Sequence, residues 1–92
     1  MVFLWERLSR RSRTQGIIDI LTEASEGANK TRIMYRANLN FFRFKRYLSE
    51  LLDKGLIAEV NNPGSGKVKY KITEEGEELL EVLKKAQRFI SL

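Results

Sequence analysis

Residues 37–52 read Ala-Asn-Leu-Asn-Phe-Phe-Arg-Phe-Lys-Arg-Tyr-Leu-Ser-Glu-Leu-Leu, and this stretch decides the fold of the chain. Apolar residues recur in it at i, i+3, i+7 and i+10, the spacing of a helix that packs one face on a core. They are Phe41, Phe44, Leu48 and Leu51. Asn40 is a favourable N-cap before them, and Gly55 is a typical terminator after them. The stretch therefore predicts an amphipathic helix that begins near residue 41.

The face opposite this apolar stripe is basic. It carries Phe42 and Arg46, flanked by Arg43 and Lys45. A helix usually has acidic residues in its first turn, because the macrodipole favours negative charge there. Here three cations occupy the first two turns, and no acid precedes Glu50. This arrangement suits a helix whose N-terminal half contacts phosphate, so we interpret it as a DNA-recognition helix.

The composition describes one small basic domain. The chain has 92 residues, 42% of them hydrophobic, and a net charge of +5. A domain of this length buries a little over ~60% of the surface that its extended chain exposes. The charge is uneven, because residues 1–72 hold 14 Lys and Arg against 7 acids, whereas residues 73–92 hold 3 against 5. The basic body predicts an anion-binding module, and the acidic tail an element with a different role.

The missing residue types argue against an enzyme. The chain has no Cys and no His, which removes disulfides, thiolate catalysis, cysteine-ligated zinc and the usual general base. We interpret the acidic cluster at residues 74–81 as helix capping rather than as a metal site. No apolar run approaches the ~18 residues of a membrane span. We therefore expect a cytoplasmic, nucleoid-associated protein with no catalytic residues, metal, cofactor, membrane partner or small-molecule ligand.

Two shorter helices are predicted before the basic helix. Ser12 and Gln15 have the spacing of a capping box, so the first core helix should begin near residue 13 and end by Gly27. Its inner face comprises Ile17, Ile20, Leu21 and Ala24. The second begins at Asn29-Lys-Thr, and its inner residues are Ile33, Met34 and Ala37. Residues 38–40 then form the turn before the basic helix.

A hairpin and a last helix complete the predicted fold. Residues 56–60 and 67–72 are strand-like, and a turn-rich run separates them. Val68, Tyr70 and Ile72 share one face of the second strand, and its lysines share the other. Thr73 caps the last helix, whose apolar stripe is Leu79, Val82, Leu83, Ala86 and Ile90, with Leu80 and Phe89 beside it. We expect a mainly α fold with a small β-hairpin, the winged helix-turn-helix, with a C-terminal dimerisation helix.

The expected organisation has three parts. Residues 1–12 form an N-terminal helical extension, residues 13–73 the winged helix-turn-helix domain, and residues 74–92 the dimerisation helix. Phe3, Trp5 and Leu8 in the extension could anchor to a membrane surface, but the segment is too short for firm binding, and we favour packing on the C-terminal helix. The dimerisation residues we expect are Val2, Phe3, Trp5, Leu8, Leu79, Val82, Leu83, Ala86, Phe89 and Ile90.

Three segments carry a resemblance to a known family. They are Thr31-Arg-Ile-Met-Tyr-Arg-Ala-Asn-Leu-Asn40, Arg46-Tyr-Leu-Ser-Glu-Leu-Leu52 and Lys71-Ile-Thr-Glu-Glu-Gly-Glu-Glu-Leu-Leu80. They resemble the archaeal winged-helix family of predicted transcriptional regulators, which includes small chromatin-associated proteins of Sulfolobus. The resemblance spans about residues 14–85 and implies sequence-general or operator DNA binding, with dimerisation through an antiparallel coiled coil of the C-terminal helix. Residues 74–92 look shorter than the dimerising helix of that family, and residues 1–12 lie outside its common pattern.

The expected partner is double-stranded DNA, bound by a homodimer that regulates transcription or organises chromatin. The candidate contact residues are Asn29, Lys30, Thr31, Arg32, Arg36, Asn40, Phe42, Arg43, Lys45, Arg46, Lys67 and Lys69. Asn40, Phe42, Arg43 and Arg46 are the candidates for base contacts. Phe42 either touches a thymine methyl group or folds back toward the second helix, and Tyr35 either reaches the backbone or packs. The alternating wing lysines also protect an edge strand from aggregation.

Two other functions remain open at this point. Winged helices also serve as protein-interaction modules in transcription or replication assemblies, although a lysine-poor wing and a neutral third helix would be typical of those. An RNA-binding winged helix is the other alternative. Competition between duplex DNA and duplex RNA would separate the nucleic-acid alternatives.

Overall fold

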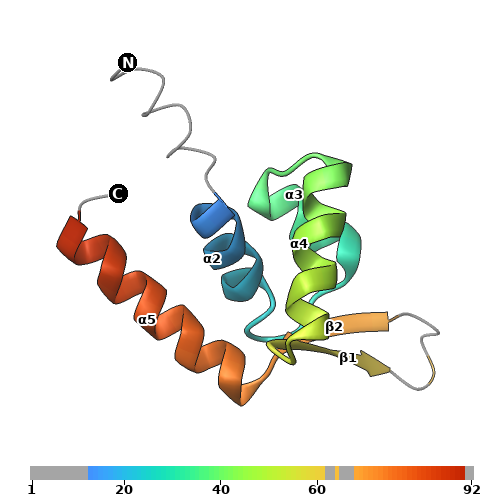
Figure 1. Ribbon diagram of the computed structural model, residues 1–92. Coiled ribbons are helices and arrows are strands. Elements are labelled where there is room, and N and C mark those ends of the chain that lie inside the picture. The colour runs from blue at the N-terminus through green and yellow to red at the C-terminus, as the bar shows by residue number, and fades with distance from the viewer. Residues whose placement is uncertain (1–12, 62–63, 65–67, 91–92) are drawn as a thin grey trace.

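The computed structural model describes residues 13–61, 64 and 68–90, and confirms the predicted order of elements over them. Three helices come first, then a hairpin and a last helix (Figure 1). They are α2 (Arg13–Glu23), α3 (Lys30–Ala37), α4 (Phe41–Asp53), β1 (Ile57–Asn61), β2 (Val68–Ile72) and α5 (Glu74–Ile90). The predicted contributions of Val2, Phe3, Trp5, Leu8, Ser12 and Lys67 lie outside the described residues. None of the described helices is both long and apolar enough to cross a membrane.

Polar side chains begin three of the helices, as the sequence predicts. Asn29 Oδ1 accepts the backbone N–H of Arg32 at 2.8 Å, and Asn40 Oδ1 accepts that of Arg43 at 2.8 Å. Thr73 Oγ1 accepts the N–H of Gly76 at 3.1 Å and donates to the Gly55 carbonyl at 2.6 Å. Each cap satisfies a backbone donor that has no partner inside its helix.

The core lies between α2, α3 and α4 and extends onto the hairpin. Its largest fully buried side chains are Ile20, Leu21, Ile33, Phe44 and Ile57. One sequence expectation is wrong, because Phe41 is 52% exposed instead of belonging to the buried stripe of α4. Tyr47 is buried with Phe44, Leu48 and Leu51, so the buried arc is centred toward Tyr47 and Phe41 falls at its edge.

The wing is an antiparallel pair of strands with one more residue beside it. The register pairs Ile57 with Ile72 at the body and Asn61 with Val68 toward the turn. The loop before α3 adds to β2 through Ala28, whose N–H donates to the Tyr70 carbonyl at 3.0 Å and whose carbonyl accepts the Tyr70 N–H at 2.8 Å. β1 begins one residue later than predicted. Val68 shares the face of Tyr70 and Ile72 but is exposed, because burial against the body ends at Tyr70.

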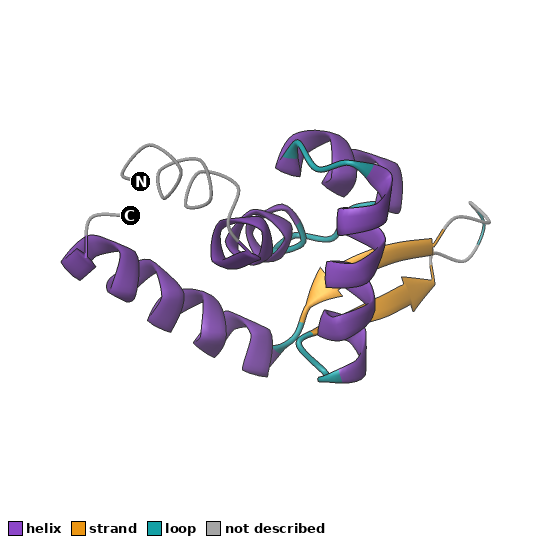
Figure 2. Cartoon of the chain, turned by 45° about the horizontal axis from the view of Figure 1, so that its top comes forward, coloured by secondary structure: helices purple, strands orange, loops and turns teal. Residues whose placement is uncertain are grey.

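Two glycines allow neighbouring elements to approach closely. A Cβ on Gly16 of α2 would lie 2.9 Å from the Tyr47 ring on α4, and a Cβ on Gly76 of α5 would lie 2.1 Å from the Leu56 carbonyl oxygen. The Gly16 contact joins α2 to α4, and the Gly76 contact joins α5 to the segment before β1, while α2 also packs against α5. α4 and α5 flank α2 on opposite sides, and the hairpin lies beyond the N-terminal end of α5 (Figure 2).

Candidate nucleic-acid interface

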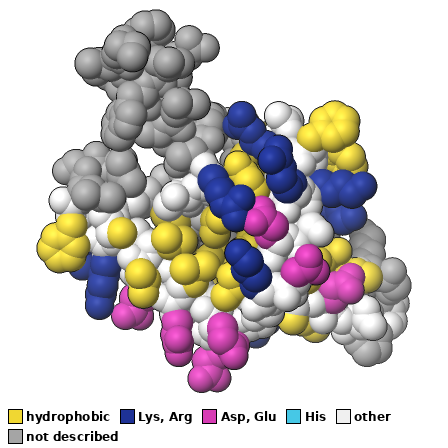
Figure 3. All heavy atoms as spheres, in the orientation of Figure 1, with side chains coloured by type: hydrophobic (Ala, Val, Ile, Leu, Met, Phe, Trp, Pro, Cys, Tyr) yellow, Lys and Arg dark blue, Asp and Glu magenta, His cyan; other side chains and the backbone are white. Residues whose placement is uncertain are grey.

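The third helix, α4, exposes its cations to solvent. Arg43, Lys45 and Arg46 are exposed, while Phe44 and Leu48 are buried on the other side. Lys and Arg side chains gather on the side of the molecule that holds α3 and α4 (Figure 3). The predicted recognition face therefore lies in solvent, with guanidinium donors that can bond to phosphate oxygens or to base edges.

An aromatic pair lies among these cations at the beginning of α4. The rings of Phe41 and Phe42 meet edge to face, with centroids 5.7 Å apart and planes at 74°. The ammonium of Lys45 lies 5.7 Å from the centroid of the Phe41 ring, within the range of a cation–π contact. Phe42 is 80% exposed, so the interpretation that it folds back toward the second helix is wrong. The other interpretation, contact with a thymine methyl group, stays a prediction.

The caps restrict what the two predicted asparagines can offer. The side-chain oxygens of Asn29 and Asn40 are both taken by backbone N–H groups. Each retains an amide nitrogen as a hydrogen-bond donor. Asn40 can therefore donate to a base or phosphate, but its oxygen is already used to begin α4.

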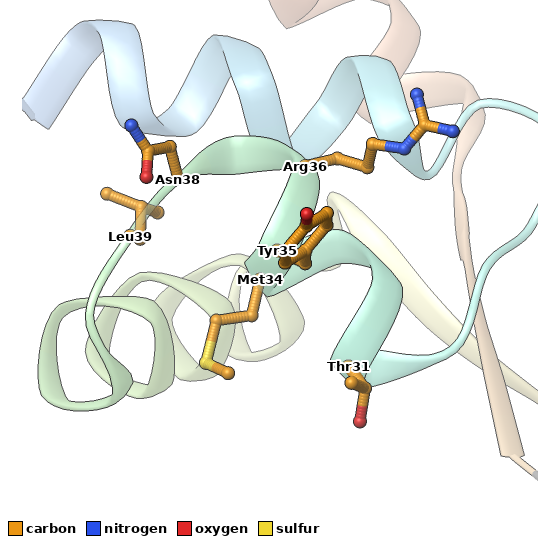
Figure 4. Close-up of a pocket in the computed structure, with 6 residues that line it drawn as sticks. All are labelled: Thr31, Met34, Tyr35, Arg36, Asn38 and Leu39. Atoms are coloured by element: carbon orange, nitrogen blue, oxygen red, sulfur yellow. The ribbon is translucent and has the colours of Figure 1, made fainter.

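The second helix, α3, adds exposed polar side chains beside α4. Lys30, Thr31, Arg32 and Arg36 are all exposed, as their proposed contacts require. A hollow of about 520 Å³ is lined by Thr31, Met34, Tyr35, Arg36, Asn38 and Leu39. Tyr35 lies at its centre and Arg36 extends away from Met34 (Figure 4). Tyr35 is 81% exposed, so the interpretation that it packs is wrong.

One ion pair on this side of the molecule was missed by the sequence reasoning. Arg13 at the start of α2 donates to the carboxylate of Glu50 in α4 at 2.5 Å. The hydrogen bond from Arg13 holds the pKa of Glu50 below its ordinary value of 4.5, with smaller help from Lys54 and Arg46, although partial burial opposes the shift. The same bond raises the pKa of Arg13. The only acid in the first three turns of α4 is therefore neutralised from another helix, which spacing along the sequence could not reveal.

The wing carries cations beyond the body. Lys69 and Lys71 are exposed on β2, opposite Val60 and Ala58 of β1, whereas Lys67 lies outside the described residues. On the buried face of the same strand, desolvation raises the pKa of Tyr70, with Glu59 of β1 adding to the shift. Lys69 and Lys71 therefore face solvent, whereas the buried Tyr70 packs the wing against the body.

The last helix, α5, presents an apolar and acidic surface. The predicted apolar surface is divided: Leu79 and Leu80 pack against the core, and Leu83 is partly buried. Val82 and Phe89 are 60% and 83% exposed, and Ala86 is exposed too. Apolar side chains cover part of this face, and acidic ones follow the outer edge of α5 (Figure 3). The side chain of Ile90 is outside the described part of the chain.

A polar contact joins α5 to α2 along the covered side. Gln87 Nε2 donates to Gln15 Oε1 at 2.6 Å, and Gln15 Nε2 donates to Asp19 Oδ1 at 2.9 Å. Across the described residues no cluster of three or more acids is arranged to hold a metal ion. The binding features of the described chain are therefore a basic face on α3, α4 and the wing, and an apolar strip on α5.

Comparisons of sequence agree with this architecture. A family model described as winged helix-turn-helix matches residues 10–91. The uncharacterized protein MJ0287 of Methanocaldococcus jannaschii is 38% identical over 74 residues, which are 79% of this chain and 70% of that protein. The uncharacterized protein MJ0290 of the same organism is 33% identical over 82 residues, 88% of this chain but 36% of the relative.

Solved structures share the fold at lower identity. Sso10a-2, a DNA-binding protein from Sulfolobus solfataricus, superposes with a TM-score of 0.76 at 24% identity, covering 88% of this chain and 83% of that one. A mutant of MarR from E. coli complexed with operator DNA superposes with a TM-score of 0.64 at 18% identity, covering 84% of this chain and 54% of that one. These similarities show the fold that the two solved structures and this chain share.

Proposed function

Because this chain belongs to the winged helix-turn-helix family, we propose that it binds duplex DNA and has no catalytic role. In this proposal α4 enters the major groove and the hairpin wing lies along the neighbouring phosphate backbone. The protein acts as a transcriptional regulator or as a chromatin-associated protein, located with the nucleoid. Sso10a-2 is named a DNA-binding protein, and the MarR mutant structure contains operator DNA; both precedents support the proposal for a chain of the same fold.

The observation that carries the proposal is the exposed basic face of α4. Arg43, Lys45 and Arg46 all lie in solvent in the first two turns, and the nearest acid, Glu50, is paired with Arg13. The positive end of the helix dipole adds to these cations instead of being offset by acids. A negatively charged partner at this face would relieve that unfavourable concentration of charge.

The flanking elements extend this surface for phosphate contacts. Lys30 and Arg32 begin α3, Arg36 ends it, and Lys69 lies on the wing. Proteins that bind DNA obtain most of their orientation from such backbone contacts, while base contacts supply selectivity. We assign base contacts to Asn40, Phe42, Arg43 and Arg46, and phosphate contacts to the remaining candidates.

The proposed assembly is a homodimer formed through α5. Val82, Ala86 and Phe89 leave an apolar strip in solvent on a helix whose Leu79 and Leu80 already contact the body. Two copies of α5 packed antiparallel would bury both strips, with Val2, Phe3, Trp5 and Leu8 closing the groove. A two-fold dimer would also present two copies of α4 to two half-sites of DNA.

A salt titration tests the proposed function. If a dimer contacts about 5–8 phosphates, log K plotted against log salt concentration should slope by roughly −5 to −7 in an anisotropy assay with duplex DNA. Lys69→Ala should weaken binding to all sequences alike and make the slope shallower by about one unit. A slope near zero would contradict DNA binding, and preferential competition by duplex RNA would favour the RNA-binding alternative.

A further inference from the structure

Phe42 is an apolar side chain on a surface that is otherwise cationic. Around α4 it lies between Lys45 and Arg46, on the side opposite the buried Phe44 and Leu48. Isolated exposed apolar residues are common on protein surfaces, so exposure alone assigns no role to this ring. A second observation is that the neighbouring Phe41 contacts the Phe42 ring at the N-terminal end of the recognition helix, α4.

Phe41 supports Phe42 from the side. The two rings meet edge to face at 5.7 Å, and Lys45 places its ammonium 5.7 Å from the centroid of the Phe41 ring. Phe41 is thus engaged by both neighbours and is 52% exposed, whereas Phe42 is 80% exposed. The arrangement leaves Phe42 as the ring directed to a partner, with a cationic side chain on either side of it.

The floor of the major groove offers few apolar groups. Each base pair presents hydrogen-bond donors and acceptors there, and thymine adds a methyl group, which apolar side chains contact. A methylated cytosine presents a methyl group on the same carbon of the ring. A helix that combines guanidinium donors with an exposed phenyl ring matches a groove floor that combines base acceptors with pyrimidine methyl groups.

We propose that Phe42 contacts pyrimidine methyl groups in the major groove, so that the chain prefers duplexes containing thymine or 5-methylcytosine. This inference rests on the proposed function, because it requires α4 in the major groove. Burying one methyl group against the ring corresponds to a roughly three- to fivefold gain in affinity. The phosphate contacts are the same for methylated and unmethylated DNA, so the salt dependence should not change.

Replacing single groups on the DNA tests this preference. Three mixed-sequence duplexes of one design are compared by anisotropy: the natural duplex, the same duplex with deoxyuridine at each thymine, and the same duplex with 5-methylcytosine at each cytosine. Deoxyuridine keeps the base pairing and removes only the methyl group. The natural duplex should bind at least about threefold more tightly than the deoxyuridine duplex, and the methylcytosine duplex more tightly still.

Variants separate the ring from the rest of the surface. Phe42→Ala should remove the methyl preference while retaining the salt slope, and circular dichroism should show a retained fold because the ring is exposed. Tyr35→Ala is the matched control: it removes an aromatic ring that is 81% exposed on α3, and it should keep the preference.

Each other outcome overturns the inference. Equal binding of the natural and deoxyuridine duplexes, or a methyl preference that persists in Phe42→Ala, overturns it while leaving the proposed function intact. Tighter binding to single-stranded DNA that depends on Phe42 would mean stacking on unpaired bases instead. Failure to bind any of the duplexes would overturn the proposed function together with this inference.

Discussion

The helices α4 and α5 are both amphipathic, yet they face solvent in different ways. The body covers most of the apolar arc of α4, and apart from Phe41 and Phe42 the side exposed to solvent is mainly cationic. In α5 the body covers only part of the apolar arc and leaves Val82 and Phe89 in water, and the first turn of the helix is acidic. One helix therefore has a surface for an anionic partner, and the other has a surface for an apolar one.

The difference follows from where each helix lies relative to α2. α4 contacts α2 and β1 and lies against the core, so Phe44, Tyr47, Leu48 and Leu51 all find partners. Among the described elements α5 makes its main contacts with α2 and β2, and Val82, Ala86 and Phe89 stay exposed outside those contacts. The proposed dimer would give the rest of this apolar arc a second interface, since helices of this kind depend on packing for stability.

The largest expected effect comes from making the exposed strip of α5 charged. Val82→Glu combined with Phe89→Glu should convert a dimer to a monomer in light scattering, because four apolar side chains leave each dimer interface. At roughly 1.5–3 kcal/mol for each side chain that becomes fully buried, the four side chains correspond to a loss of roughly 6–12 kcal/mol per dimer.

A valine on the wing gives the control for this substitution. Val60→Glu changes an exposed valine outside α5 and should leave the mass unchanged. If the unaltered chain is a clean monomer at micromolar concentration, the comparison fails, and the strip on α5 is not a dimer interface.

Removing cations from α4 should have the next largest effect. Arg43→Ala with Arg46→Ala should weaken binding to duplex DNA by about 2–6 kcal/mol, since each lost arginine contact costs roughly 1–3 kcal/mol. Lys84→Ala with Lys85→Ala removes the same charge from α5 and should change affinity far less. Equal losses in the two double variants would mean that net charge, rather than the α4 face, determines binding.

The two glycine contacts test how each helix is joined to the body. Gly76→Ala places a Cβ 2.1 Å from a backbone oxygen of Leu56 and should destabilise the fold by about 1–3 kcal/mol in urea unfolding. In Gly16→Ala the new Cβ would lie 2.9 Å from the Tyr47 ring, and a small movement of the ring can relieve this contact. The better helix propensity of alanine stabilises the helix by about 1 kcal/mol, which offsets part of the remaining loss of stability. A larger loss from Gly16→Ala would indicate that α4 is the more tightly fitted helix.

The smallest expected effect concerns the pH dependence of the Arg13–Glu50 pair. Because the pKa of Glu50 is lowered in the folded chain, its contribution to stability is present above its ordinary pKa and is lost as the pH falls through the folded value. The advantage of the unaltered chain over Glu50→Gln should therefore be largest near neutral pH and shrink in acid. Urea unfolding at a series of pH values measures it, and an advantage that grows in acid would contradict the assignment. Glu81→Gln, in the exposed pair with Lys85, is the control and should leave the unfolding midpoint unchanged.

Most of the fold could be predicted because its signals are local. The caps Asn29, Asn40 and Thr73 act on backbone groups within three residues, and each begins the helix that the sequence predicts. The cations of α4 were assigned to solvent from helical spacing, which alone separates them from Phe44 and Leu48. The exposure of Phe41 could not be predicted, because spacing alone does not show that the body lies on the Tyr47 side of the helix.

The sequence by itself determined the order of the elements, the residues that begin each helix and the sign of the charge on α4 and α5. These properties depend on residues a few positions apart, whose relative directions the helix and strand periods dictate. Only the tertiary structure decided that Arg13 pairs with Glu50, that Ala28 joins Tyr70 beside the wing, and how much of the apolar arc of α5 stays in water. Those outcomes depend on distances between segments far apart in the chain, which are set when the core packs.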